Sequence, residues 1–129
     1  MIMALDHITI NVKNLEETLI FYRDILELPV LPPVETAIQK VYYFALPGGT
    51  RLELIHYYAN TGISDGNELA QGNCRHFAFV VDDIKKLEAK LVRAGYSFHL
   101  PIAYSEDFHC TAGLMKDPNG FELEFIQQR

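Results

Sequence analysis

Apolar and polar residues alternate along residues 7–12, HITINV, which is typical of a half-buried β-strand. The apolar residues then change to the spacing of an α-helix: Leu15, Leu19, Tyr22 and Leu26. Asn14 precedes this stripe and can cap the helix, and Glu17, three residues later, completes a capping box. Three further strands are predicted near residues 28–31, 40–46 and 51–57.

The same succession returns in the second half of the chain. A strand over residues 76–81, HFAFVV, is followed by a stripe at helical spacing: Ile84, Leu87, Leu91 and Ala94. Asp83 can cap this helix at its start, and Gly95 supplies the stop at its end. Further strands are predicted near residues 97–100, 110–116 and 122–127. In both halves a Gly-Gly or Asn-Gly pair marks the hairpin between the last two strands.

The two halves align as copies of one unit. His7 falls on His76 with an offset of 69 residues (76 − 7), and Glu53 falls on Glu124 with an offset of 71 (124 − 53), so the second copy carries two extra residues. Each copy has the order βαβββ, which predicts an α+β fold of two βαβββ modules in one domain overall. The predicted boundaries are residues 1–57 for the first module, 58–73 for a Gly-containing linker and 74–129 for the second module.

Charged and imidazole side chains interrupt the strand pattern at matching places. Alternate residues of a strand share a face, so His7 lies opposite the apolar residues that must meet the helix. Each half thus contributes one imidazole and one carboxylate to the face not covered by its own helix. An ionised carboxylate there needs a partner, and two imidazoles with two carboxylates suit a divalent metal ion. The predicted ligands are His7, Glu53, His76 and Glu124.

Each of these residues also has a simpler interpretation. A single histidine in a strand is more often structural than a ligand, and a glutamate in a strand is usually on a solvated face. Arg51 could neutralise Glu53 or Glu122. The metal site is favoured because the same residue types recur at matching positions in both copies. Glu122 has Arg51 as its counterpart in the repeat, so a structural or pocket-lining role is predicted for it.

Composition narrows the choice of partner and compartment. The formal net charge of −6, without any block of basic residues, argues against nucleic-acid binding. No apolar run approaches the roughly 20 residues of a membrane span, and the start, MIMALDHITI, lacks the basic region of a signal peptide. Cys74 and Cys110 do not make a disulfide framework. A reducing, cytoplasmic compartment is therefore expected.

Three segments carry a resemblance to a known family: LDHITINVKNLEETLIFYRDIL, RHFAFVVDDI and DPNGFELEF. With them the chain resembles the vicinal oxygen chelate superfamily, which has the glyoxalase I-type fold. The resemblance implies two modules whose curled mixed sheets surround a metal-containing cavity. It implies the same four ligands, one divalent Ni, Zn, Co or Mn ion, and a homodimer. The site would lie within one chain or be shared between two.

The identity of the fourth ligand bears on the reaction. Extradiol dioxygenases and fosfomycin-modifying members have no carboxylate at the position of Glu53, methylmalonyl-CoA epimerase has Gln there, and glyoxalase I has all four ligands. The resemblance thus implies a lyase or isomerase similar to lactoylglutathione lyase, acting on a small 2-oxo or 2-hydroxy carbonyl compound or its thiol adduct. The metal would stabilise an enediolate while Glu53 or, by preference, Glu124 transfers the proton.

Two alternatives stay open beside this interpretation. An epimerase-like enzyme would perform the same proton transfer with Glu53 in place of the usual Gln. A non-enzymatic resistance protein would bind a small molecule without metal. The bound metal content distinguishes the second alternative from the enzymes, and the substrate distinguishes the first.

Two departures from the glyoxalase I pattern concern the substrate. Asn11 stands where an Arg usually holds glutathione, and Tyr57 stands where an Asn is usual. Losing a bidentate clamp predicts weak use of glutathione adducts. Tyr104 and His109 lie in LPIAYSEDFHCTAG, a segment for which an ordinary polar hairpin is favoured over a loop that covers the pocket. These four residues are the candidate substrate-binding residues.

Overall fold

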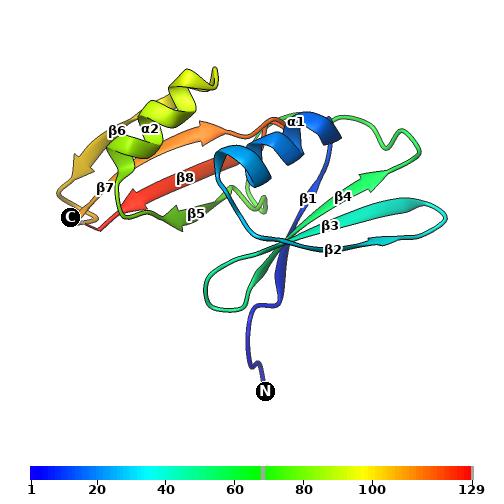
Figure 1. Cartoon of the computed structure of the whole chain (residues 1–129). Helices are drawn as coiled ribbons and strands as arrows, with labels where there is room; N and C mark the ends of the chain where they lie inside the picture. The colour runs from blue at the N-terminus through cyan, green and yellow to red at the C-terminus, as the bar shows by residue number, and fades with distance from the viewer. Residues whose placement is uncertain (68, 129) are drawn as a thin grey trace. The chain divides into compact units, whose positions relative to one another are not determined.

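The computed structural model describes residues 1–67 and 69–128. The chain consists of two compact units, Met1–Ser64 and Asp65–Arg129, and the boundary falls within the predicted linker. In each unit the helical segment follows the first strand, and three strands follow the helical segment (Figure 1). Among the described residues, no helix is long and apolar enough to cross a membrane.

The first unit builds one mixed sheet of four strands. Its strands are β1 (His7–Asn11), β2 (Val30–Glu35), β3 (Gln39–Ala45) and β4 (Arg51–Tyr57), and its helical segment is α1 (Leu15–Leu19) with η1 (Ile20–Ile25). The spatial order is β1-β4-β3-β2, in which β1 and β4 are parallel and the other pairs are antiparallel.

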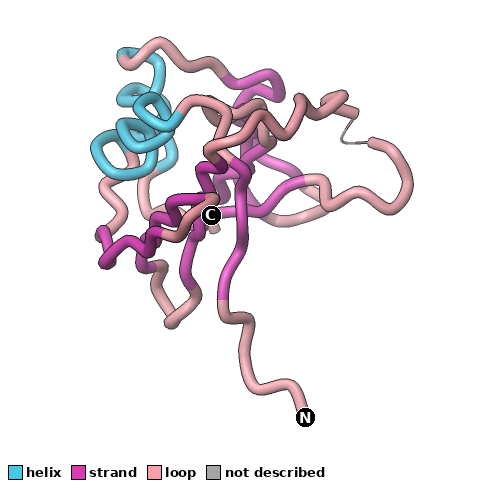
Figure 2. Tube along the Cα trace, turned by 90° about the vertical axis from the view of Figure 1, so that its right-hand side faces the viewer, coloured by secondary structure: helices cyan, strands magenta, loops and turns pink. Residues whose placement is uncertain are grey.

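The second unit repeats this topology. Its elements are β5 (His76–Val80), α2 (Ile84–Arg93), β6 (Phe98–Ser105), β7 (Cys110–Lys116) and β8 (Glu122–Gln127). The spatial order is β5-β8-β7-β6, again with one parallel pair, β5 and β8. The predicted α+β fold of two βαβββ modules is confirmed, and the strands make up most of the regular structure in both units (Figure 2).

The first helical segment begins as predicted but continues differently. The side chain of Asn14 accepts a hydrogen bond from the Glu17 amide at 3.0 Å, which is the expected N-cap. After Leu19 the helix widens into a π-helix, in which the Leu26 amide donates to the Phe21 carbonyl at 2.9 Å. Phe21, at the start of this wider turn, is completely buried. The predicted stripe of a regular α-helix did not include Phe21 and was incomplete.

The second helix follows the predicted signals closely. Asp83 accepts from the Lys86 amide at 2.9 Å. At the other end Gly95 has φ +95°, and the Tyr96 amide donates to the Leu91 carbonyl at 3.0 Å, which is a Schellman motif. Ala94 was predicted to belong to the buried stripe, and this was wrong. It is the exposed C-cap, beyond the last turn that packs on the sheet.

The two edge strands that contain proline differ most from prediction. β2 extends to Glu35 and β6 to Ser105, beyond the predicted ends near residues 31 and 100. The register of β2 shifts around Pro32 and Pro33, and that of β6 shifts around Pro101. Proline cannot donate to a ladder, so strands containing it are confined to sheet edges and interrupted by irregularities.

Alternation within the strands separates a packed face from a face that carries polar groups. In the second unit the packed face is aromatic: Phe79 lies 5.3 Å from Phe77 and 5.9 Å from Phe125, measured between ring centroids. Leu91 and Ile84 of α2 are also buried. His76 alternates with Phe77 and therefore projects from the opposite face, as does Ala78.

Candidate functional site

In the first unit, His7 and Glu53 lie on neighbouring parallel strands. The His7 Nε2 atom is 3.8 Å from Oε1 of Glu53. Thr9 is the register partner of Glu53, and its hydroxyl donates to the same carboxylate oxygen at 2.9 Å. The Tyr43 phenol, on the other neighbouring strand, is hydrogen-bonded with this carboxylate, and that bond raises the pKa of Tyr43. Glu53 is thus a nearly buried carboxylate held by two hydroxyl groups.

The second ring nitrogen of His7 is also engaged. Its Nδ1 atom lies 2.7 Å from Oδ2 of Asp6, and the same oxygen accepts from Nη2 of Arg51 at 2.7 Å. These contacts, the imidazole first and the guanidinium second, lower the pKa of Asp6 below its ordinary value. Arg51 was considered as a partner of Glu53 or Glu122; instead it binds Asp6.

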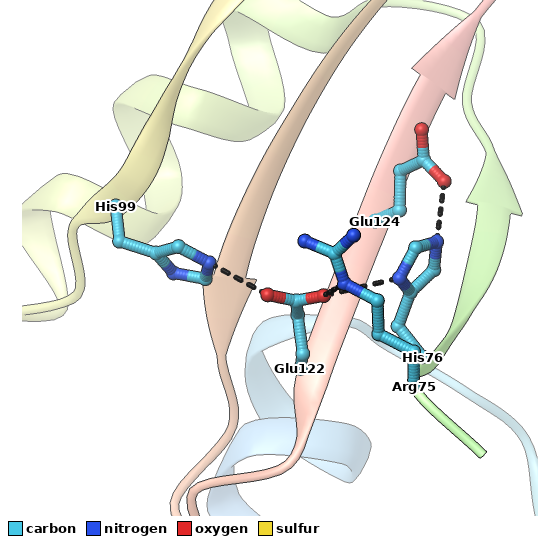
Figure 3. A network of polar contacts seen from close by, with 5 residues as sticks. All are labelled: Arg75, His76, His99, Glu122 and Glu124. Carbon is cyan, nitrogen blue, oxygen red and sulfur yellow. Dashed lines mark hydrogen bonds and ion pairs between the residues drawn. The ribbon is translucent and has the colours of Figure 1, made fainter. Parts of the chain in front are cut away.

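The second unit holds a matching pair. The His76 Nε2 atom is 2.9 Å from Oε2 of Glu124 (Figure 3), and about a quarter of each side chain is exposed. The register partner of Glu124 is Ala78, at the place that Thr9 occupies opposite Glu53. Glu124 therefore has no hydroxyl opposite it, whereas Glu53 does.

A buried carboxylate, Glu122, organises the surroundings of His76 (Figure 3). Its Oε1 atom lies 3.0 Å from Nδ1 of His76 and 2.9 Å from Nε of Arg75, and its Oε2 atom lies 2.9 Å from Nε2 of His99. Burial raises the pKa of Glu122, but the hydrogen bonds to His99, Arg75 and His76 outweigh it, and the pKa is lowered overall. The carboxylate remains ionised although only 3% of the residue is exposed.

A cavity of about 470 Å³ opens beside Glu124 within the second unit. Its lining is partly apolar, with Leu100, Phe108, Ala112 and Ile126, and partly polar, with Tyr104, Ser105, His109, Cys110 and Glu124. Tyr104 reaches the cavity from β6, so it is a strand residue, and β6 and β7 form the favoured hairpin. His109 lies in the turn between β6 and β7 with φ 54°, in the left-handed region.

The structure brings the predicted residues together in two pairs and one cavity. His7 joins Glu53, His76 joins Glu124, and Tyr104 and His109 line the cavity with Glu124. Asn11 and Tyr57 are at the ends of β1 and β4, and by alternation they share the faces of His7 and Glu53 respectively.

Four residues around the pairs were not predicted as site residues: Asp6, Thr9, Arg75 and His99. Thr9 could have been found, because it lies in the same strand as His7 and on the same face. Asp6 and Arg75 each directly precede a site histidine in the sequence, and this position was the only indication of their role. His99 gave none, because its contact with Glu122 depends on the irregular course of β6.

The donor atoms of each pair fit a divalent metal ion of the first transition row. An imidazole Nε2 faces a carboxylate oxygen while a second carboxylate holds Nδ1, which is how metal-binding histidines are commonly oriented. Each pair offers two ligands. Within the described part of the chain, no group of three or more His, Cys, Asp and Glu side chains is close enough to bind a metal ion by itself.

Comparison with known proteins decides the family. The model of the Glyoxalase/Bleomycin resistance protein/Dioxygenase superfamily matches residues 4–125. The chain belongs to this superfamily. A lactoylglutathione lyase of Neisseria meningitidis serogroup A is 29% identical over 132 aligned positions, which cover 98% of this chain and 92% of that enzyme.

Solved structures of the superfamily agree with the fold. A glyoxalase/bleomycin resistance protein/dioxygenase domain from Frankia sp. EAN1pec superposes with a TM-score of 0.79 at 21% identity, covering all of both chains. The trypanothione-dependent glyoxalase I of Leishmania major gives 0.74 at 23% identity, covering 98% of this chain and 87% of that one. A fosfomycin resistance protein from Listeria monocytogenes gives 0.72 at 19%, covering 98% and 94%. Because this glyoxalase fold carries several activities, the reaction must be argued from the site.

Proposed function

We propose that this superfamily member is a metal-dependent lyase or isomerase of the glyoxalase I type. The observation that carries the proposal is the repeated pair: in both units an imidazole Nε2 faces a glutamate carboxylate, and a second carboxylate holds Nδ1. The similarity to a lactoylglutathione lyase over nearly the whole chain supports the same reaction class.

The proposed ligands of one divalent ion are His7, Glu53, His76 and Glu124. Nickel, zinc, cobalt and manganese all accept such nitrogen and oxygen donors. When bound, the ion would act as a Lewis acid on the oxygens of a carbonyl substrate. We expect a homodimer, and the proposal holds equally for a site within one chain and for a site shared between two chains.

We assign the proton transfer to Glu124. A carboxylate that carries a proton between neighbouring carbons must be able to move, and Glu53 is restrained by hydrogen bonds from Thr9 and Tyr43. Glu124 faces Ala78 instead and lines the cavity in the second unit, and its 2.9 Å contact is with Nε2 of His76, a ligand of the same proposed ion. Glu124 would remove the proton from the carbon next to the carbonyl and return it to the adjacent carbon.

The cavity beside Glu124 is the proposed place of the substrate. Its apolar side chains would exclude water from the reacting carbon, which strengthens electrostatic interactions there. Tyr104 and His109 would donate hydrogen bonds to substrate oxygens. Asn11 and Tyr57 replace the residues that bind glutathione in the glyoxalase I pattern, so we propose a 2-oxoaldehyde adduct of a thiol other than glutathione.

The proposal is tested by following isomerisation of methylglyoxal adducts by the metal-loaded protein. Adducts of glutathione and of smaller thiols are compared for wild type, Glu124→Gln and Glu53→Gln. We expect turnover with a small-thiol adduct, little turnover with the glutathione adduct, and the larger loss of kcat in Glu124→Gln. Equal, wild-type activity in both variants would remove the proton-transfer role. Epimerisation of an acyl-CoA without isomerase activity would replace the lyase by an epimerase.

A further inference from the structure

Each of the two site histidines is hydrogen-bonded at Nδ1 to a carboxylate, and this carboxylate is itself bound to an arginine. In the first unit the order is His7 Nδ1, Asp6 and Arg51, with both contacts at 2.7 Å. In the second unit the order is His76 Nδ1, Glu122 and Arg75, at 3.0 and 2.9 Å. The same contact network of imidazole, carboxylate and guanidinium thus occurs in both units.

In the repeat, the acidic and the basic residue of this contact network have exchanged positions between the two units. With the offsets of 69 and 71 residues, Asp6 corresponds to Arg75 and Arg51 corresponds to Glu122. The residue before the histidine supplies the carboxylate in the first unit and the guanidinium in the second. The residue opposite the histidine in the register, Arg51 opposite His7 and Glu122 opposite His76, supplies the other member.

This exchange separates a requirement of the site from an accident of the surface. An ion pair needed only for folding could have either polarity and need not touch the histidine. Here the polarity differs between the units, yet in both units the carboxylate reaches Nδ1 of the imidazole. What is common to the two units is the hydrogen bond to Nδ1.

We infer that Asp6 and Glu122 are positioning residues that aim Nε2 of His7 and His76 at the metal ion, and that Arg51 and Arg75 hold these carboxylates in place. This inference rests on the proposed function. A carboxylate that accepts the Nδ1 proton fixes the imidazole tautomer and the ring orientation, and leaves the Nε2 lone pair for a ligand. The arginine keeps the carboxylate charged and turned toward the ring.

The two positioning residues are not equivalent. The Asp6 side chain is 70% exposed, and water competes for its oxygens. The Glu122 side chain is only 2% exposed, and it receives a third contact, from His99 at 2.9 Å. Within the described part of the chain His99 is hydrogen-bonded to Glu122, so it acts on His76 through Glu122. Glu122 therefore has the stronger hold, and its loss is expected to cost more than the loss of Asp6.

The test measures zinc and cobalt affinity of the full chain by competition with a chromogenic chelator. Losing an outer partner of a ligating histidine lowers metal affinity by about 10–100-fold, so we expect the upper part of this range for Glu122→Ala and the lower part for Asp6→Ala. Urea unfolding of the metal-free variants accompanies each titration. If Glu122→Ala does not fold, Asp6→Ala still tests the inference, because Asp6 is exposed and its removal should leave folding intact.

The charge exchange provides a matched rescue. Asp6→Arg combined with Arg51→Glu gives the first unit the arrangement of the second, with a carboxylate opposite His7. We expect Asp6→Arg alone to lower metal affinity at least about tenfold and the double variant to return to within about threefold of wild type. Glu88→Gln, which removes the ion pair to Lys85 on α2, is the control and should leave affinity unchanged.

The outcomes separate the inference from the proposed function. If wild type binds metal tightly and Asp6→Ala and Glu122→Ala bind equally well, the positioning role is wrong although the metal site stands. A double variant that regains folding stability but not affinity also overturns it, because the pair would then be structural. A wild type that binds neither zinc nor cobalt, nor nickel or manganese in the same competition, overturns the proposed function, and the positioning role with it.

Discussion

Placing a threonine opposite Glu124 should slow the enzyme by restraining its proton-transferring carboxylate. Thr9 lies opposite Glu53 and donates to it at 2.9 Å, and Ala78 occupies the matching place opposite Glu124. Ala78→Thr therefore gives Glu124 the hydrogen bond that Glu53 already has. Ala78 is exposed, so the larger side chain has room.

The magnitude follows from the strength of the added bond. A hydrogen bond to a charged acceptor contributes about 1.5–3 kcal/mol, and the lower end applies because a quarter of the Glu124 side chain is exposed. If this bond must break before the carboxylate reaches the substrate, the barrier rises by about 1.5 kcal/mol. That corresponds to a loss of roughly tenfold in kcat.

The assay compares kcat for the best thiol-adduct substrate in wild type, Ala78→Thr and Ala78→Val. Valine has the shape of threonine without the hydroxyl group, so we expect it to retain wild-type kcat, and metal affinity should be unchanged in both variants. An undiminished kcat in Ala78→Thr would refute the assignment of the mobile carboxylate. An equal loss in Ala78→Val would attribute the effect to bulk alone.

The remaining predictions concern stability and substrate binding. Burial raises the pKa of Glu122, but its hydrogen bonds lower the pKa by more, so the ionised carboxylate stabilises the fold above about pH 4.5, and this stabilisation is lost as the pH falls through the lowered pKa. The urea midpoints of wild type and Glu122→Gln should therefore converge on acidification, and a constant difference would contradict this. Gly113→Ala should destabilise by about 1–3 kcal/mol in urea unfolding, because a Cβ there would lie 2.7 Å from Cγ1 of Ile102; an unchanged midpoint would mean that β6 yields freely. His109→Asn should raise KM several-fold without lowering stability, since asparagine tolerates the left-handed backbone; an unaltered KM would remove His109 from substrate binding.

The repeat made most of the fold predictable. Its strands, its two N-caps at Asn14 and Asp83, and the Gly95 stop are local signals, and each is decided within a few residues. The errors lie where tertiary structure overrides local pattern. The wide turn after Leu19 and the proline-containing strands β2 and β6 depend on packing against the rest of the sheet.

The candidate site was predictable only in part. Alternation along a strand indicates which face a side chain is on, and it predicted that His7 lies with Glu53 and His76 with Glu124. It does not indicate which neighbour an arginine binds. Arg51 has carboxylates within reach on its own strand and beside β1, and the choice of Asp6 depends on distances that only the folded strands define.

Metal binding tests the central claim most directly. Protein purified without chelators or a metal-affinity tag is analysed for bound elements, beside the His7→Ala/His76→Ala double variant. The account predicts about one equivalent of nickel, zinc, cobalt or manganese per set of four ligands, lost in the double variant. Wild-type protein that binds no metal after reconstitution, or a double variant that keeps its full metal content, would contradict it.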